Sequence, residues 1–184
     1  RRPMEPVPVL SLWLPILASA AIVFAASSVV HMVLPYHRGD WRRVPKEDEV
    51  MAALGAFRLE PGDYSMPRPS SMADMKSPAF IEKMNKGPAA MITIRRPGPM
   101  SMGPSLAMWF GYSVVVSAFA AYLTSRALVM QPGADYLHVF RFAGTSAFLG
   151  YSMALAQHSI WYGRSWRTTV VSMLDGLLYG CLTA

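Results

Sequence analysis

Residues 9 to 34 read VLSLWLPILASAAIVFAASSVVHMVL, a stretch without Asp, Glu, Lys or Arg. About 20 consecutive apolar residues suffice to cross a bilayer as a helix, and this stretch is longer. It is also far longer than the ~7 to 15 apolar residues at the centre of a signal peptide, and HMVLPYHRGDW after it offers no small-residue cleavage site. The stretch therefore predicts a permanent transmembrane helix.

The rest of the chain has the same character, since 53% of all residues are hydrophobic and 15% are charged. Three further apolar runs follow, and we expect them to span the membrane at about 106–126, 141–163 and 167–184. The predicted fold is an all-α integral membrane protein with four transmembrane helices. It divides into an N-terminal segment with the first span (1–35), an insertion (36–103) and the remaining spans (104–184).

The positions of Lys and Arg predict the orientation. Most of the 17 basic residues lie in the insertion or in the turn GRSWR at 163–167. Positive residues near the ends of spans mark the cytoplasmic side. We therefore expect a multi-pass protein of a bacterial inner membrane, cytoplasmic or intracytoplasmic, with the insertion in the cytoplasm and both termini outside.

The insertion of about 65 residues is rich in Pro and Met and has little material for a core. VPKEDEVMAALGAF (44–57) and SPAFIEKMNKG (77–87) predict short helices, and AAMITIRR (89–96) predicts a short strand. Such a segment needs a surface to lie on, either its own helix ends or a partner. Aromatic and basic residues near the span ends are expected to anchor the chain at the membrane interface; these are Tyr36, Trp41, Arg42, Trp161 and Trp166.

Small residues recur every four positions in three of the four predicted spans. The rows are Ser113, Ser117 and Ala121 in the second span, Ser146, Gly150 and Ala154 in the third, and Ser172, Gly176 and Gly180 in the fourth. The first span has a looser cluster of Ala21, Ala25 and Ser28. Small side chains let helices approach closely in lipid, where water supplies no hydrophobic drive. These faces are expected to pack against other helices, whether of this chain or of another subunit.

Asp175 lies in the apolar run TTVVSMLDGLLYG (168–180), next to the row of small residues. Because a carboxylate facing lipid is costly, Asp175 should face protein or water. A tight hairpin between the third and fourth spans would bring His158 or Gln157 to its depth, and Tyr112, Tyr151 and Tyr162 are further candidate partners. We expect an intramembrane polar contact between helices; a proton relay or ion site is the alternative.

The four histidines predict no metal site. His31 and His37 flank Pro35 at the cytoplasmic end of the first span, where His158 could join them, but no helix carries two His at the i, i+4 spacing of zinc sites, and Cys181 stands alone. One His as an axial ligand to a haem or chlorophyll stays open, and a hydrogen-bonding role is favoured for each. No nucleophile elbow or phosphate-binding loop is present, so we expect no catalytic site.

The pattern HRGDWRRVPKEDEVMAAL (37–54), followed by PGDYSMP (61–67) and three spans, resembles a group of small bacterial four-helix inner-membrane proteins. The resemblance covers most of the chain. It implies the topology and a bacterial source, and the group has no assigned activity.

These observations predict a non-catalytic accessory or structural subunit of a larger bacterial membrane complex. A bioenergetic setting is favoured, either a photosynthetic reaction-centre and light-harvesting assembly or a respiratory complex. Its partners would be membrane lipids and other integral membrane subunits, with no nucleic acid. No intrinsic cofactor is expected, and contact with pigments or lipids would come through a partner complex. The competing hypotheses are a small transporter or proton-conducting protein that uses Asp175 and His158, and a membrane-bound enzyme.

Overall fold

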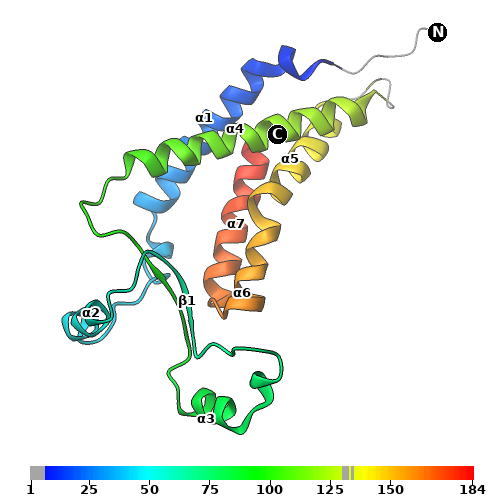
Figure 1. Ribbon diagram of the computed structural model, residues 1–184. Coiled ribbons are helices and arrows are strands. Elements are labelled where there is room, and N and C mark those ends of the chain that lie inside the picture. Colours follow the sequence, from blue (N-terminus) through cyan, green and yellow to red (C-terminus); the bar gives the residue numbers. More distant parts are fainter. Residues whose placement is uncertain (1–6, 130–132, 134) are drawn as a thin grey trace. The chain divides into compact units, whose positions relative to one another are not determined.

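The computed structural model describes residues 7–129, 133 and 135–184, and most of them are helical (Figure 1). The chain divides into two compact units. The first combines the residues up to Trp41 with Ser101–Ala184, and the second is Arg42–Met100. Each unit is described by itself.

The first unit contains the long helices. Its elements are η1 (Val9–Leu12), α1 (Trp13–Met32), η2 (Pro35–His37), α4 (Gly103–Leu128), α5 (Tyr136–Ser152), η4 (Met153–Leu155), α6 (Ala156–Tyr162) and α7 (Trp166–Thr183). Among the described residues, Val9–Met32 and Gly103–Leu128 are long and apolar enough to cross a membrane, with 24 and 26 residues. They coincide with the first two predicted spans.

The other two predicted spans are helical, with one interruption. The span expected at 141–163 begins earlier, at Tyr136, and a 3₁₀ turn (η4) divides it into α5 and α6. Asp135 caps α5, because its carboxylate accepts a hydrogen bond from the His138 backbone N–H at 3.1 Å and lies 2.7 Å from His138 Nδ1. Gly163, in the left-handed conformation, ends α6 and leads into α7.

Helices α5 and α7 run side by side (Figure 1). Glycines of α7 make the contact close. A Cβ atom added to Gly176 would lie 1.9 Å from the Ser152 hydroxyl oxygen, and one added to Gly180 would lie 2.9 Å from the Gly144 carbonyl oxygen. No larger residue fits there without movement of α5. Two members of the predicted row on α7 thus face α5.

Helix α4 packs on both α1 and α5. A buried cluster joins the helices of this unit, made of Val23, Val116, Ala120, Ala147, Tyr151 and Tyr179. Ser113 and Ser117 of the predicted α4 row are buried, and Gly150 of the α5 row lies against Val116. Of the remaining predicted packing residues, Ala121, Ser146 and Ser172 are half-buried and Ala154 is exposed.

Helix α1 packs through a face other than its predicted cluster. Its buried residues are Ile16, Ala20, Val23, Ser27 and Val30. Ala21 and Ala25 are exposed and Ser28 is half-buried. Ala21 and Ala25 therefore point away from the other helices described in this unit.

The second unit is a small assembly of α2 (Glu47–Ala56), β1 (Gly62–Met66), η3 (Asp74–Lys76), α3 (Pro78–Lys86) and β2 (Ala90–Ile94). The strands pair antiparallel from Gly62 opposite Ile94 to Met66 opposite Ala90. Both predicted helices and the predicted strand are present. The partner strand β1 was not among the expected elements, because the Pro-Gly pair in EPGDY (60–64) is typical of a turn. None of these elements contains a buried residue.

Candidate functional site

Five polar side chains of the first unit gather where α1 ends beside the middle of α7. His31 belongs to the last turn of α1, Tyr36, His37 and Asp40 follow in the next segment, and Asp175 comes from α7. We call this group the histidine–carboxylate cluster.

Local turns after α1 bring the side chains of Tyr36, His37 and Asp40 to the same place. Pro35 opens the 3₁₀ turn η2, where its fixed φ suits the first position. The Arg38 N–H donates to the Pro35 carbonyl and the Asp40 N–H to the His37 carbonyl, both at 3.0 Å. These two consecutive turns fold the segment back on itself, so the side chains of His37 and Asp40, three residues apart in sequence, come into contact.

Asp175 is 5% exposed and draws its partners from this segment. The Tyr36 hydroxyl donates to Asp175 Oδ1 at 2.7 Å. Burial, together with the hydrogen bond to Asp175, raises the pKa of Tyr36 to about 12. Tyr36 therefore stays a neutral donor to the carboxylate throughout the physiological range.

His37 lies between two carboxylates. Its Nδ1 is 2.7 Å from Asp40 Oδ2, and its Nε2 is 2.9 Å from Asp175 Oδ2. The first pair is a hydrogen bond. The second pair is close without hydrogen-bond geometry, and both of its atoms are buried without a hydrogen-bond partner among the described residues. The Arg167 guanidinium, 3.7 Å from Asp40 Oδ1, is the nearby positive group.

The His31 ring stacks on the His37 ring, with centroids 4.4 Å apart and planes 15° from parallel. His31 Nδ1 is 3.1 Å from the Ser27 carbonyl oxygen one turn earlier on α1. Since a carbonyl only accepts, Nδ1 carries the hydrogen and Nε2 of a neutral His31 has a free lone pair. The Ser27 hydroxyl in turn accepts from Trp109 Nε1 at 2.8 Å, which ties this turn to α4.

The structure changes the predicted partners of Asp175. His158 and Gln157 are exposed on α6, and Asp175 contacts Tyr36 and His37 in their place. The physical reason lies in the rotation of α6: its buried residue is Ser159, whose hydroxyl donates to Thr169 Oγ1 at 2.7 Å. With Ser159 facing α7, the two preceding residues point elsewhere.

The predicted interface anchors fall into two groups. Trp41 and Trp161 are 87% and 73% exposed, and Arg42 and Trp166 are exposed too. Tyr36 is 36% exposed and differs from these four because its hydroxyl belongs to the cluster. No periodic pattern marks the cluster; the one signal that could have indicated it is HRGD at 37–40, a histidine and a carboxylate three residues apart directly after a span.

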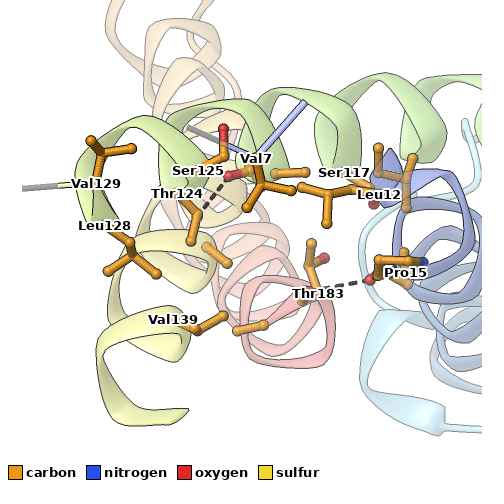
Figure 2. Close-up of a pocket in the computed structure, with 16 residues that line it drawn as sticks. Val7, Leu12, Pro15, Ser117, Thr124, Ser125, Leu128, Val129, Val139 and Thr183 are labelled. Carbon is orange, nitrogen blue, oxygen red and sulfur yellow. Dashed lines mark hydrogen bonds between the residues drawn. The ribbon is translucent and has the colours of Figure 1, made fainter. Parts of the chain in front are cut away.

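A second feature of this unit is an apolar groove of about 550 Å³ at the C-terminal end of α7 (Figure 2). Its walls come from the start of α1, the second half of α4, Val139 and Ala143 of α5, and the chain end at Thr183 and Ala184. The Ser19 hydroxyl, one of the few polar groups there, donates to the Pro15 carbonyl at 2.7 Å and lies 3.2 Å from the Thr183 carbonyl oxygen. The groove is suited to an aliphatic chain or an apolar side chain.

The donor atoms of the cluster could hold either a proton or a metal ion. His31, His37 and Asp175 each offer one ligand atom, and these atoms lie within 4.8 Å of one another. No protein-family model, curated protein or solved structure matches this chain. What the cluster does must therefore be argued from its own geometry.

Proposed function

We propose that this protein is a non-catalytic accessory subunit of a larger bacterial membrane complex, held there by helix packing. The observation that carries the proposal is the outer face of α1. Ala18, Ala21 and Ala25 are exposed and lie three and four residues apart, so they share one face, opposite the buried residues of the same helix.

This face has the composition of a helix–helix contact in lipid. Large side chains border the three alanines, among them Leu14, Ile22 and Val29, all exposed. A shallow channel of small residues between larger ones admits a neighbouring helix closely, and in lipid such close packing is what drives association. The helices that the structure describes use the other face of α1, so within the described residues the alanine face is available to a partner subunit.

The membrane arrangement we propose has four spans. The first span is η1 with α1, and the second is α4. The third is formed by α5, η4 and α6 together, and the fourth is α7. The insertion and the turn at 163–167 hold most of the basic residues, which supports a cytoplasmic location for both. A photosynthetic or respiratory complex is the setting we propose, and the groove of Figure 2 supports contact with lipid tails or with apolar groups of the complex.

The test is native purification in mild detergent from cells that carry substitutions on the α1 face. Ala21→Leu and Ala25→Leu fill the channel and should release the chain from its partners, whereas Cys181→Leu, at an exposed position of α7, should not. Mass spectrometry identifies stoichiometric partners, and an absorption spectrum of the purified material detects pigments or haem. A wild-type chain that purifies alone would overturn the proposal.

A proton-conducting or transport function is the second candidate, and one observation favours it. The buried carboxylate of Asp175 lies beside Tyr36 and His37, and His37 continues to Asp40, so ionisable groups succeed one another from the end of α1 to the middle of α7. Proton flux into proteoliposomes distinguishes the two functions. Flux that Asp175→Asn abolishes while the chain stays assembled would support conduction, and absence of flux in the wild type would exclude it.

A further inference from the structure

We propose that His31, His37 and Asp175 bind one divalent transition-metal ion, with Zn²⁺ the ion that fits best. The site ties the end of α1 to the middle of α7. It is independent of whether the chain joins a larger complex, because every residue that it uses belongs to the first unit.

The first argument is the hydrogen count on His37. A neutral imidazole has one N–H. At 2.7 Å from a carboxylate oxygen, Nδ1 uses that hydrogen on Asp40, so the Nε2 lone pair faces Asp175 Oδ2 at 2.9 Å. Two electron-rich atoms at that separation need either a proton on Nε2 or a cation beside them. A metal ion meets the need, since neutral imidazole nitrogen and carboxylate oxygen are both ligands for it.

The second argument is the support of the ligands. A metal-binding histidine usually donates its other ring N–H to a carboxylate or a backbone carbonyl, which fixes the tautomer and the ring orientation. Here Asp40 does this for His37, and the Ser27 carbonyl does it for His31. The Tyr36 hydroxyl holds the second oxygen of Asp175, which leaves Oδ2 for the ion.

The third argument concerns charge and access. Asp40 and Asp175 are two carboxylates beside one guanidinium, that of Arg167, so these three groups sum to a negative charge that attracts a cation. His31 is exposed, His37 half-buried and Asp175 buried. The ion therefore has a path of entry from the His31 side and a buried anionic ligand at its end, as a plausible metal site requires.

The ligand set indicates the class of ion. Two imidazoles with one carboxylate suit zinc and its first-row neighbours, whereas Mg²⁺ and Ca²⁺ prefer oxygen ligands alone. Ligand atoms around a tetrahedral zinc lie about 3.4 Å apart. The three atoms here lie within 4.8 Å of one another. Because the His31 ring is stacked on the His37 ring and an imidazole lone pair lies in the ring plane, the exposed His31 ring has to turn out of the stack for its Nε2 to point at the same ion. A fourth position stays open to water.

The experiment uses the full chain in detergent micelles, cleared of metal with a chelator and titrated with ZnCl₂ alone. We expect one Zn²⁺ per chain in the wild type. His37→Ala and Asp175→Asn, which each remove a ligand, should weaken binding by at least about 100-fold, more than the ~10- to 100-fold typical of residues that support ligands. His158→Ala, an exposed histidine outside the site, is the matched control and should bind as the wild type does.

Asp40→Asn keeps the shape of the side chain and removes its charge, so it tests the site where a ligand variant fails to fold. As a positioning residue, it should cost about 10- to 100-fold in affinity and retain one ion per chain. Co²⁺ in place of Zn²⁺ gives a visible spectrum that depends on the ligands, and the wild-type spectrum should change in His31→Ala. Far-UV circular dichroism of each metal-free variant verifies its fold.

Three outcomes would overturn the proposal. They are a wild type that binds no Zn²⁺, a His158→Ala variant that loses as much affinity as His37→Ala, and binding that survives in a variant lacking all three ligands. The first of these would leave a protonated His37 between Asp40 and Asp175 as the occupant of the cluster.

Discussion

Helix α7 makes two contacts of opposite kind, and the difference shows what each is for. Toward α5 it presents two glycines, and the contact depends on close packing. Gly176 lies against the side chains of Tyr151 and Ser152, and Gly180 lies against the backbone of Gly144 and Phe148. Toward the segment after α1 it presents Asp175, and the contact consists of hydrogen bonds and charge. A close-packed contact has no room for an added atom. A polar contact depends instead on each hydrogen-bond donor and acceptor that takes part in it.

The largest loss of stability should come from disrupting the close packing between α5 and α7. Gly180→Ala places a methyl group against the Gly144 carbonyl and the Phe148 backbone, which cannot rotate away, so we expect a loss of about 3 kcal/mol in the free energy of unfolding. The measurement is unfolding in mixed micelles, followed by circular dichroism.

Gly111→Ala on α4 is the matched control, because an added Cβ there meets no described atom within 4 Å. Alanine should even gain up to about 1 kcal/mol there through its helix propensity. Equal losses in the two variants would show that glycine flexibility, and not the close approach of α5, sets the effect.

The polar contact should be the next most sensitive. Tyr36→Phe removes the donor to Asp175 Oδ1 and leaves a buried carboxylate oxygen unpaired, for a loss of about 1.5 to 3 kcal/mol, the range for hydrogen bonds to charged groups. The same unfolding measurement applies, with the exposed Tyr162→Phe as control. In an Asp175→Asn background the loss should shrink, because a neutral amide oxygen is the weaker acceptor; an undiminished loss would place the effect of Tyr36 elsewhere.

The same two contacts show what the sequence could predict. Gly176 and Gly180 belong to a row with a period of four, so their role follows from local spacing. Asp175 could be predicted as buried and partnered, from the cost of a carboxylate in lipid. Its partners could not, because Tyr36 is 139 residues away and reaches it through two consecutive turns, which leave no periodic trace.

Two further points have to do with position in three dimensions. The cluster Ala21, Ala25 and Ser28 was expected to pack against a helix of this chain or of another subunit; the described helices of this chain use the face with Val23 and Val30, so the expectation stays a prediction about a partner subunit. Candidate metal ligands were sought at i, i+4 within a helix, whereas His31, His37 and Asp175 come from three elements. The spacing of residues within one helix cannot predict a contact between side chains that come from separate elements.

A smaller effect should come from the hairpin between α6 and α7, where shape and polarity combine. Ser159→Ala removes the buried hydrogen bond to Thr169 at 2.7 Å, and we expect a loss of about 0.6 kcal/mol, typical of polar contacts between helices in membranes. Ser172→Ala is the control, because that hydroxyl bonds only within its own helix, to the Thr168 carbonyl. A Ser172→Ala loss as large as that of Ser159→Ala would show that the bond between helices adds nothing beyond a local one.

The smallest effect should lie at a contact that is neither close-packed nor buried, the cap of α5. Hydrogen bonds from the His138 side chain and backbone hold the pKa of the Asp135 carboxyl below its ordinary value of 3.8. A carboxyl with a lowered pKa stabilises the folded chain above its ordinary pKa, and that stabilisation is lost as the pH falls through the lowered value. We expect the melting temperature to fall slightly over this acidic window in the wild type and less in Asp135→Asn, which accepts a hydrogen bond without titrating. Because the cap is exposed and local, a drop at acidic pH that is the same in both proteins would assign the pH dependence to carboxyl groups other than Asp135.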